Sequence, residues 1–200
     1  MTDSTTKPEI EFWFEFGSTY SYLTMMRIED EAQRYGVKVV WKPFLLGPIF
    51  QSLGTTPLKE KNAYVLKDMA RQSEKYGLKW VEPSSLPRLG MLPIRIALLG
   101  AEEPWVGPFC REVMVLNYVQ HADINQPDTL APILTKLGLS PSDIFDQAKS
   151  DPIKTRLREQ TEQARAKGIF GAPTFFVGRE MFWGNDRLDD ALKFASSQRV

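Results

Sequence analysis

Cysteine and histidine are almost absent from this chain of 200 residues, which contains one of each. The single Cys110 excludes an internal disulfide and the paired cysteines of a thiol redox centre. Because Cys110 lies in an apolar helical pattern, we expect a buried, unreactive side chain. The single His121 argues against a histidine-based metal centre or a serine–histidine relay, so the sequence predicts no metal site.

Net charge and long apolar runs are also missing. Lys plus Arg is 25 and Asp plus Glu is 25, so electrostatics provides no attraction to nucleic acid or to an anionic membrane. No apolar run approaches the roughly 20 residues that span a bilayer, and residues 1–8 lack the apolar core of a secretory signal. We therefore expect a cytoplasmic protein with neither nucleic-acid nor membrane partners.

Both ends of the chain carry strand patterns. Residues 10–16 alternate apolar and charged side chains, residues 22–32 predict a helix, and residues 37–41 predict a second strand, parallel to the first. Near the other end, strands at 174–177 and 180–183 flank a tight turn. A final helix follows over residues 187–196, and Asn185 or Asp186 would cap it.

Between these ends, from residue 45 to 167, the sequence shows helical patterns punctuated by prolines and almost no strand signal. The expected helices cover residues 57–76, 91–99, 109–119, 129–137 and 153–167. This order predicts an α/β protein with one discontinuous domain, formed by residues 9–44 and 168–200. Residues 45–167 would form an all-helical insertion domain.

Ser18 is the first candidate functional residue, because it lies between the first strand and its helix. A hydroxyl at that position meets free backbone N–H groups and the positive end of the helix dipole, which favour an anion. Thioredoxin-type enzymes stabilise their own thiolate at such a corner. This chain has no sulfur there, so a thiolate would have to arrive with a ligand. An ordinary N-cap is the simpler alternative.

Gly171-Ala172-Pro173-Thr174 is the second candidate, directly before the third strand. A cis Ala172–Pro173 bond would turn the backbone of Ala172 toward a neighbouring cleft. An extended, peptide-like ligand could then pair with that backbone as an added strand. The alternative is a trans proline that begins an edge strand.

The combination resembles the thioredoxin fold with a helical insertion, as in DsbA and kappa-class glutathione transferases. More specifically, residues 14–23 (FEFGSTYSYL) resemble the opening of 2-hydroxychromene-2-carboxylate isomerases. Residues 170–177 and 182–188 (FWGNDRL) resemble the C-terminal block of that family. The resemblance spans nearly the whole chain and is strongest at its two ends.

Members of that family bind glutathione as a cofactor, and the resemblance implies a role for each matching residue. Ser18 would be the catalytic residue and would hydrogen-bond the glutathione thiolate. Ala172 would pair with the cysteinyl backbone, and Asp186 would bind the γ-glutamyl ammonium group while the helix N-terminus takes the carboxylate. The implied cofactor-binding residues are Ser18, Thr55, Ala172, Pro173, Trp183, Gly184, Asn185 and Asp186, with Thr55 at the glycyl end.

The activity implied is a reversible, glutathione-dependent interconversion of 2-hydroxychromene-2-carboxylate and trans-o-hydroxybenzylidenepyruvate in naphthalene-type aromatic degradation. The partner would be a small aromatic substrate, and the resemblance also implies a homodimer. Two alternatives remain open. One is a kappa-class-like transferase that conjugates glutathione to an electrophile, and the other is a non-catalytic thioredoxin-like binding protein.

Overall fold

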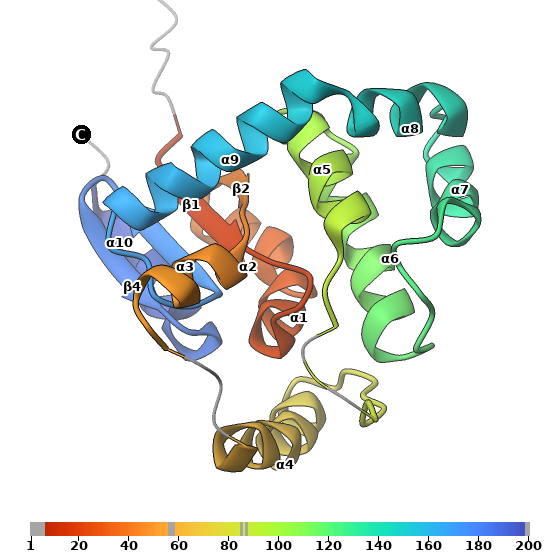
Figure 1. The fold of residues 1–200 in the computed structure, drawn as a ribbon. Helices are drawn as coiled ribbons and strands as arrows, with labels where there is room; N and C mark the ends of the chain where they lie inside the picture. Colours follow the sequence, from red (N-terminus) through yellow and green to blue (C-terminus); the bar gives the residue numbers. More distant parts are fainter. Residues whose placement is uncertain (1–6, 56–58, 85, 87, 199–200) are drawn as a thin grey trace, which may run out of the picture.

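The computed structural model describes residues 7–55, 59–84, 86 and 88–198. Its centre is a four-stranded sheet in the order β2-β1-β3-β4. β1 (Glu9–Phe14) runs parallel to β2 (Lys38–Pro43) and antiparallel to β3 (Thr174–Val177), which forms a hairpin with β4 (Glu180–Trp183). Segments from both ends of the chain therefore build one sheet, as Figure 1 shows in red, orange and blue.

Ten α-helices and one 3-10 helix surround this sheet in the described residues, and most lie between β2 and β3. They are α1 (Thr19–Met25), α2 (Ile28–Tyr35), α3 (Leu46–Ser52), α4 (Lys59–Lys75), α5 (Met91–Leu99), α6 (Val106–Tyr118), α7 (Pro127–Lys136), α8 (Pro141–Lys149), α9 (Asp151–Ala166), η1 (Asn185–Arg187) and α10 (Leu188–Ser197). The expected β–α–β beginning, helical middle, hairpin and final helix are confirmed.

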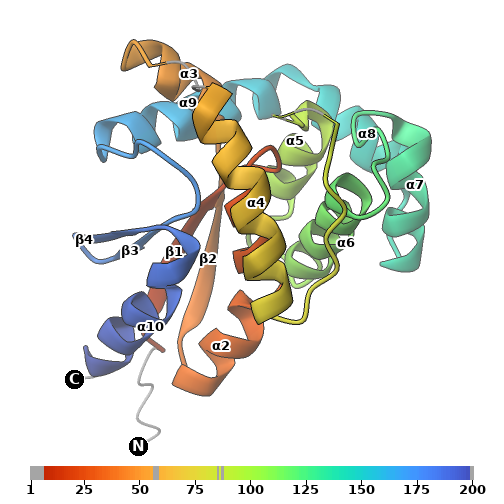
Figure 2. The ribbon, with the colours of Figure 1, turned by 90° about the horizontal axis from the view of Figure 1, so that it is seen from below.

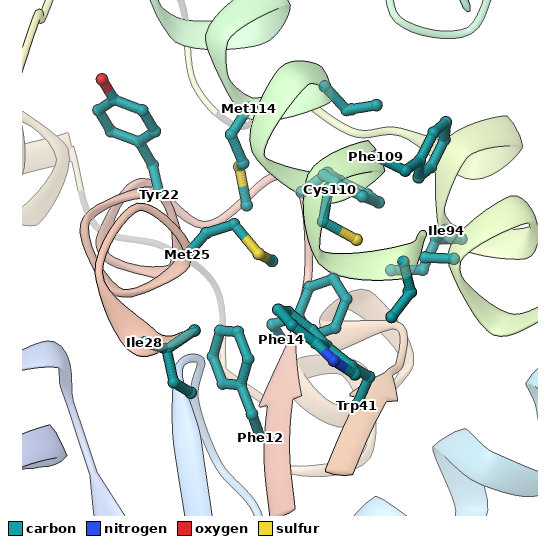
Figure 3. Close-up of a cluster of buried hydrophobic side chains, with 14 of the residues drawn as sticks. Phe12, Phe14, Tyr22, Met25, Ile28, Trp41, Ile94, Phe109, Cys110 and Met114 are labelled. Carbon is teal, nitrogen blue, oxygen red and sulfur yellow. The ribbon is translucent and has the colours of Figure 1, made fainter. Parts of the chain in front are cut away.

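One face of the sheet carries the larger core. Phe12 stacks against Phe14 and Phe175, and its ring also meets the edge of Trp41. Helices α2 and α10 cover this face beside the strands (Figure 2). Figure 3 shows the aromatic side chains beneath Met25 and Ile28, with Cys110 and Met114 of α6 nearby. Cys110 is buried, and burial raises the pKa of its thiol well above the ordinary value, as expected for an unreactive cysteine.

The opposite face is covered by α3 and α9. Trp13 packs there with Phe44 and Phe176, together with Leu46 and Ile49 of α3. Trp13 is 1% exposed, so a strand that alternates like a half-solvated one is in fact enclosed on both faces. The residue after this strand, Glu15, is also buried, with 7% exposure.

The first predicted helix is wrong in one respect, because residues 22–32 do not form a single helix. α1 ends at Met25 and α2 begins at Ile28, with Arg27 between them at φ −130° and ψ −18°. Arg27 leaves the helical path to pair with Asp189 at 3.0 Å and to cover the ring of Tyr76. The break therefore joins α1 to the C-terminal helix.

Other predictions need smaller changes. The short helix α3 was not predicted, and the expected start of the next helix, at residue 57, lies outside the described residues. No helix in the described part of the chain combines the length and apolar character needed to cross a membrane. The division into domains at residues 44/45 and 167/168 stays a prediction.

Candidate functional site

Ser18 joins two segments that are far apart in sequence. Its backbone is extended, and its side-chain oxygen accepts a hydrogen bond from Ser21 N at 3.2 Å, so Ser18 caps α1, which is the simpler alternative that the sequence offered. The same hydroxyl donates to the carbonyl oxygen of Ala172 at 2.8 Å, across 154 positions of sequence. The two candidate segments therefore meet in the fold.

The Ala172–Pro173 peptide bond is cis, as predicted. The carbonyl of Pro173 accepts a hydrogen bond from Gly184 N at 3.0 Å, which fixes this segment to the turn after β4. Gly184 has φ +109°, a backbone conformation that residues other than glycine rarely adopt. A glycine at 184 therefore lets the chain turn directly from β4 into η1.

Asn185 and Asp186 do not cap the final helix, so that prediction is wrong. Neither η1 nor α10 has a side-chain cap hydrogen bond. Asn185 is 5% exposed, and its Oδ1 instead accepts from Thr24 Oγ1 at 3.1 Å and from Arg27 at 3.4 Å. The side chain turns inward because it accepts hydrogen bonds from Thr24 in α1 and from Arg27 in the break after α1.

The turn into η1 offers free donors. Hydrogen bonds among the described residues leave the backbone N–H groups of Asn185 and Asp186 without an acceptor. The Asp186 side chain is exposed and lies 3.5 Å from Arg187. Two unpaired N–H groups beside an exposed carboxylate suit a ligand group that carries both an anion and an ammonium.

Tyr20 connects the neighbourhood of Asp186 to an acidic residue of α4. Tyr20 of α1 donates to Asp68 Oδ2 of α4 at 2.9 Å. Burial, the hydrogen bond to Asp68 and the nearby charges of Asp68, Tyr64 and Asp186 raise the pKa of the Tyr20 hydroxyl. Asp68 and Asp186 thus both act on Tyr20, and each of these carboxylates also has an arginine nearby, Arg71 at 4.0 Å and Arg187 at 3.5 Å.

Thr55 and Trp183 are less closely connected to the corner. Thr55 is exposed, and its described hydrogen bonds go to the carbonyl of Phe50 in its own turn. The structure therefore does not join Thr55 to Ser18. Trp183 is half-exposed, and its ring packs edge-on against Phe170 with 4.8 Å between the ring centroids. Its indole nitrogen occupies the space that a side chain at Gly171 would need.

Glu15 is a residue that the sequence analysis missed. It is 7% exposed, and burial raises the pKa of its carboxyl from 4.5 to about 7, against a lowering hydrogen bond from Leu46. That bond runs from Leu46 N to Glu15 Oε1 at 3.3 Å. The only signal in the sequence is a glutamate between two phenylalanines directly before Gly17.

A network of polar side chains supports the turn from the α6 side. Asn117 Nδ2 donates to the carbonyls of Phe16 at 3.0 Å and Arg88 at 3.1 Å, and its Oδ1 accepts from Arg88 Nε at 2.9 Å. Tyr118 also donates to the Phe16 carbonyl at 3.1 Å. The backbone just before Ser18 is therefore held by α6.

Comparison with known proteins agrees with this architecture. A family model for DSBA-like thioredoxin domains matches residues 9–194. A 2-hydroxychromene-2-carboxylate isomerase from Pseudomonas putida is 32% identical over 186 residues, covering 90% of each chain. A solved structure of a 2-hydroxychromene-2-carboxylate isomerase aligns with a TM-score of 0.84 and 27% identity, covering 95% of each chain. The glutathione S-transferase kappa 1 of Caenorhabditis elegans is 23% identical over 198 residues, covering 90% of this chain and 88% of the relative.

These matches place the chain in the DSBA-like thioredoxin domain family. Within that fold, the chain belongs to the family of 2-hydroxychromene-2-carboxylate isomerases, and it is an enzyme. The family resemblance inferred from residues 14–23 and from the C-terminal block is confirmed.

Proposed function

We propose that this enzyme binds glutathione and uses it to interconvert 2-hydroxychromene-2-carboxylate and trans-o-hydroxybenzylidenepyruvate. This reaction would be a step in naphthalene-type aromatic degradation. One observation carries the proposal. The Ser18 hydroxyl and the Ala172 carbonyl lie 2.8 Å apart at the start of α1, and no cysteine lies at this corner. Relatives named as isomerases and as glutathione transferases support the assignment.

The residues present fit a charged tripeptide. The free N–H groups of Asn185 and Asp186 would take the γ-glutamyl carboxylate. The exposed Asp186 carboxylate would take its ammonium group. The backbone of Ala172 would pair with the cysteinyl unit. Thr55 stays the predicted contact for the glycyl end, and Trp183 stays a predicted wall of the site.

Bound glutathione would supply a thiolate that adds reversibly to a conjugated carbon, so that a double bond becomes single, rotates and forms again. The role of Ser18 is to change its hydrogen-bond partner. Its hydroxyl, which donates to the Ala172 carbonyl in this structure, would donate to the glutathione sulfur instead, and the Ser21 N–H would keep the Ser18 oxygen in place. A hydrogen bond that favours the charged form lowers the pKa of the thiol.

Two measurements test the proposal. The melting temperature should rise when glutathione is added, since a ligand at a hundredfold excess over its Kd stabilises the fold by about 2.7 kcal/mol. An assay on 2-hydroxychromene-2-carboxylate should then show product formation with no net loss of glutathione. A melting temperature that does not move with millimolar glutathione would reject the proposal and favour the non-catalytic binding protein.

The conjugating transferase is the second candidate, because relatives carry the name glutathione S-transferase kappa at 23% and 20% identity. It would use the same groups around Ser18. Stoichiometric consumption of glutathione with an electrophile, together with no isomerisation of the chromene acid, would select it. A homodimeric assembly and a cytoplasmic location remain predictions, which size-exclusion chromatography and cell fractionation can check.

A further inference from the structure

We propose that Glu15 is a proton-holding positioning residue of the Ser18 corner, neutral whenever a glutathione thiolate occupies that corner. The inference rests on the proposed binding of glutathione. It assigns a role to a buried acid that neither the predicted site nor the hydrogen-bond network of Asn117 includes.

The position of Glu15 supports this role. Its carbonyl accepts the N–H of Ser18 at 3.2 Å, so both residues belong to one tight turn. A Cβ built on Gly17, between them, would lie 3.6 Å from Glu15 Oε2 and 3.0 Å from Leu89 Cδ2. The carboxyl thus lies directly against the backbone that leads to the proposed sulfur position.

The surroundings of Glu15 lack a compensating cation. Among the described residues, the carboxylate has one hydrogen-bond donor, Leu46 N at the start of α3, and takes part in no ion pair. From α6, Tyr118 faces it, and after burial the charge of Glu15 is what raises the pKa of that hydroxyl. Arg88, the cation on this side, donates instead to Asn117 Oδ1 and the Ala122 carbonyl.

A buried carboxylate without a cation beside it is costly to ionise, and such groups cluster at functional sites. Its raised pKa of about 7 means that the empty enzyme holds a mixture of both forms near neutrality. Two negative charges close together in a buried site repel each other, which couples their titrations. Thiolate formation and Glu15 ionisation should therefore oppose one another.

The proton balance follows directly. When glutathione binds to the ionised form, its S–H bond breaks and the electron pair stays on sulfur. Glu15 takes up one proton, either from the thiol or through solvent, and the total charge of the complex does not change. A neutral Glu15 also keeps a hydroxyl that can donate a hydrogen bond toward the corner.

The first test is a titration of the bound thiol by its thiolate absorbance in wild type and in Glu15→Gln. The glutamine keeps the oxygen that accepts from Leu46 N but cannot ionise. The thiol pKa should fall by about one unit in Glu15→Gln, and the second titration step of the wild type should vanish. Glu11→Gln is the matched control, since Glu11 lies on β1, the strand that leads to Glu15, and pairs with Lys167. The pKa of the bound thiol in this variant should equal that in wild type.

A second test needs no variant, in case Glu15→Gln does not fold. Infrared difference spectra of the wild type near neutral pH should show a protonated-carboxyl band when glutathione binds, and no such band with S-methylglutathione, which cannot form a thiolate. If glutathione shifts the melting temperature but neither the band nor the thiol pKa changes, the role of Glu15 is overturned while glutathione binding stands. If glutathione does not bind, the proposed function fails first.

Discussion

Two buried polar groups support the same turn and differ in how completely they are paired. Asn117, on the helical side, uses its carbonyl oxygen and both amide hydrogens in three hydrogen bonds. Glu15, at the end of the sheet, has a single backbone donor for its carboxyl. Both are nearly inaccessible to solvent, at 1% and 7% exposure.

This difference in hydrogen bonding gives the two buried residues different roles, one in stability and one in proton exchange. A saturated amide contributes to stability and has no proton to exchange, so Asn117 can only hold the backbone. An unpaired carboxyl lowers stability when it ionises, and its protonation can respond to a ligand. Variants of these two residues should therefore affect different observables, and the following experiments test that separation.

Asn117→Ala should produce the largest loss of stability. It would leave the Phe16 carbonyl with one fewer donor and would remove the partners of the Arg88 Nε and carbonyl groups, at about 1–3 kcal/mol for each buried group left unpaired. We expect the free energy of unfolding to fall by about 3–5 kcal/mol in urea titrations. Asn125→Ala, which removes exposed hydrogen bonds to the start of α5, should cost less. Equal losses in the two variants would contradict the structural role of Asn117.

Glu15 should make the wild type less stable as the pH rises. Its pKa is raised from 4.5 to about 7 in the folded state, so the folded protein binds the proton more tightly than the unfolded chain. Its stabilising effect is complete below about pH 4.5, is lost between pH 4.5 and about 7, and is absent above that. The total loss is about 3 kcal/mol.

Urea unfolding of wild type and Glu15→Gln across this pH range measures the difference. The variant should lack the slope and should become more stable than wild type above pH 7. If the free energy of unfolding changes with pH in the same way for the two proteins, the pKa of Glu15 is not raised in the folded state.

Ser18→Ala should leave the fold nearly intact but reduce turnover. Loss of one hydrogen bond to a charged group costs about 1.5–3 kcal/mol, which corresponds to a roughly 10- to 100-fold slower reaction. Much of the glutathione affinity should remain, because the charged ends of the tripeptide have other partners. Steady-state kinetics and calorimetric binding test this pair of outcomes, and wild-type turnover would reduce Ser18 to a helix cap.

Thr24→Val should have the smallest effect. It removes the buried hydrogen bond to Asn185 Oδ1 and should cost about 1 kcal/mol of stability. Because this bond fixes η1 to α1, glutathione affinity should weaken along with stability, while the thiol pKa stays unchanged. A changed thiol pKa would show that η1 and the Ser18 corner are not independent.

Local patterns in the sequence were sufficient for the strands and the hairpin, and they offered the N-cap as one of two interpretations of Ser18. The cis Ala172–Pro173 bond was expected from the order of motifs along the whole chain. Local patterns failed where a tertiary partner decides the outcome. The helix break at Arg27 depends on Asp189 and Tyr76, which are far away in the chain. The side chain of Asn185 turns inward because Thr24 and Arg27 donate hydrogen bonds to it. Sequence rules for helix caps do not include such donors from distant parts of the chain.

Glu15 was missed for a related reason. Alternation along β1 places Glu15 in phase with Glu11, and Glu11 reaches an ion pair with Lys167. The same pattern therefore gives no sign that one glutamate is partly solvated and the other enclosed. The enclosure comes from α3, whose first residue, Leu46, binds the carboxyl, and α3 was not predicted.

The order of strands in the sheet also has a consequence for synthesis of the protein. β1 can pair with β2 once residue 43 has left the ribosome, but its other edge has no partner strand until β3 has been made. The Ser18 hydroxyl likewise waits for Ala172, 154 positions later. A nascent chain should therefore carry an open strand edge through the synthesis of the whole helical segment, a state that invites aggregation. The tendency of the nascent chain to aggregate should accordingly fall only when β3 is released.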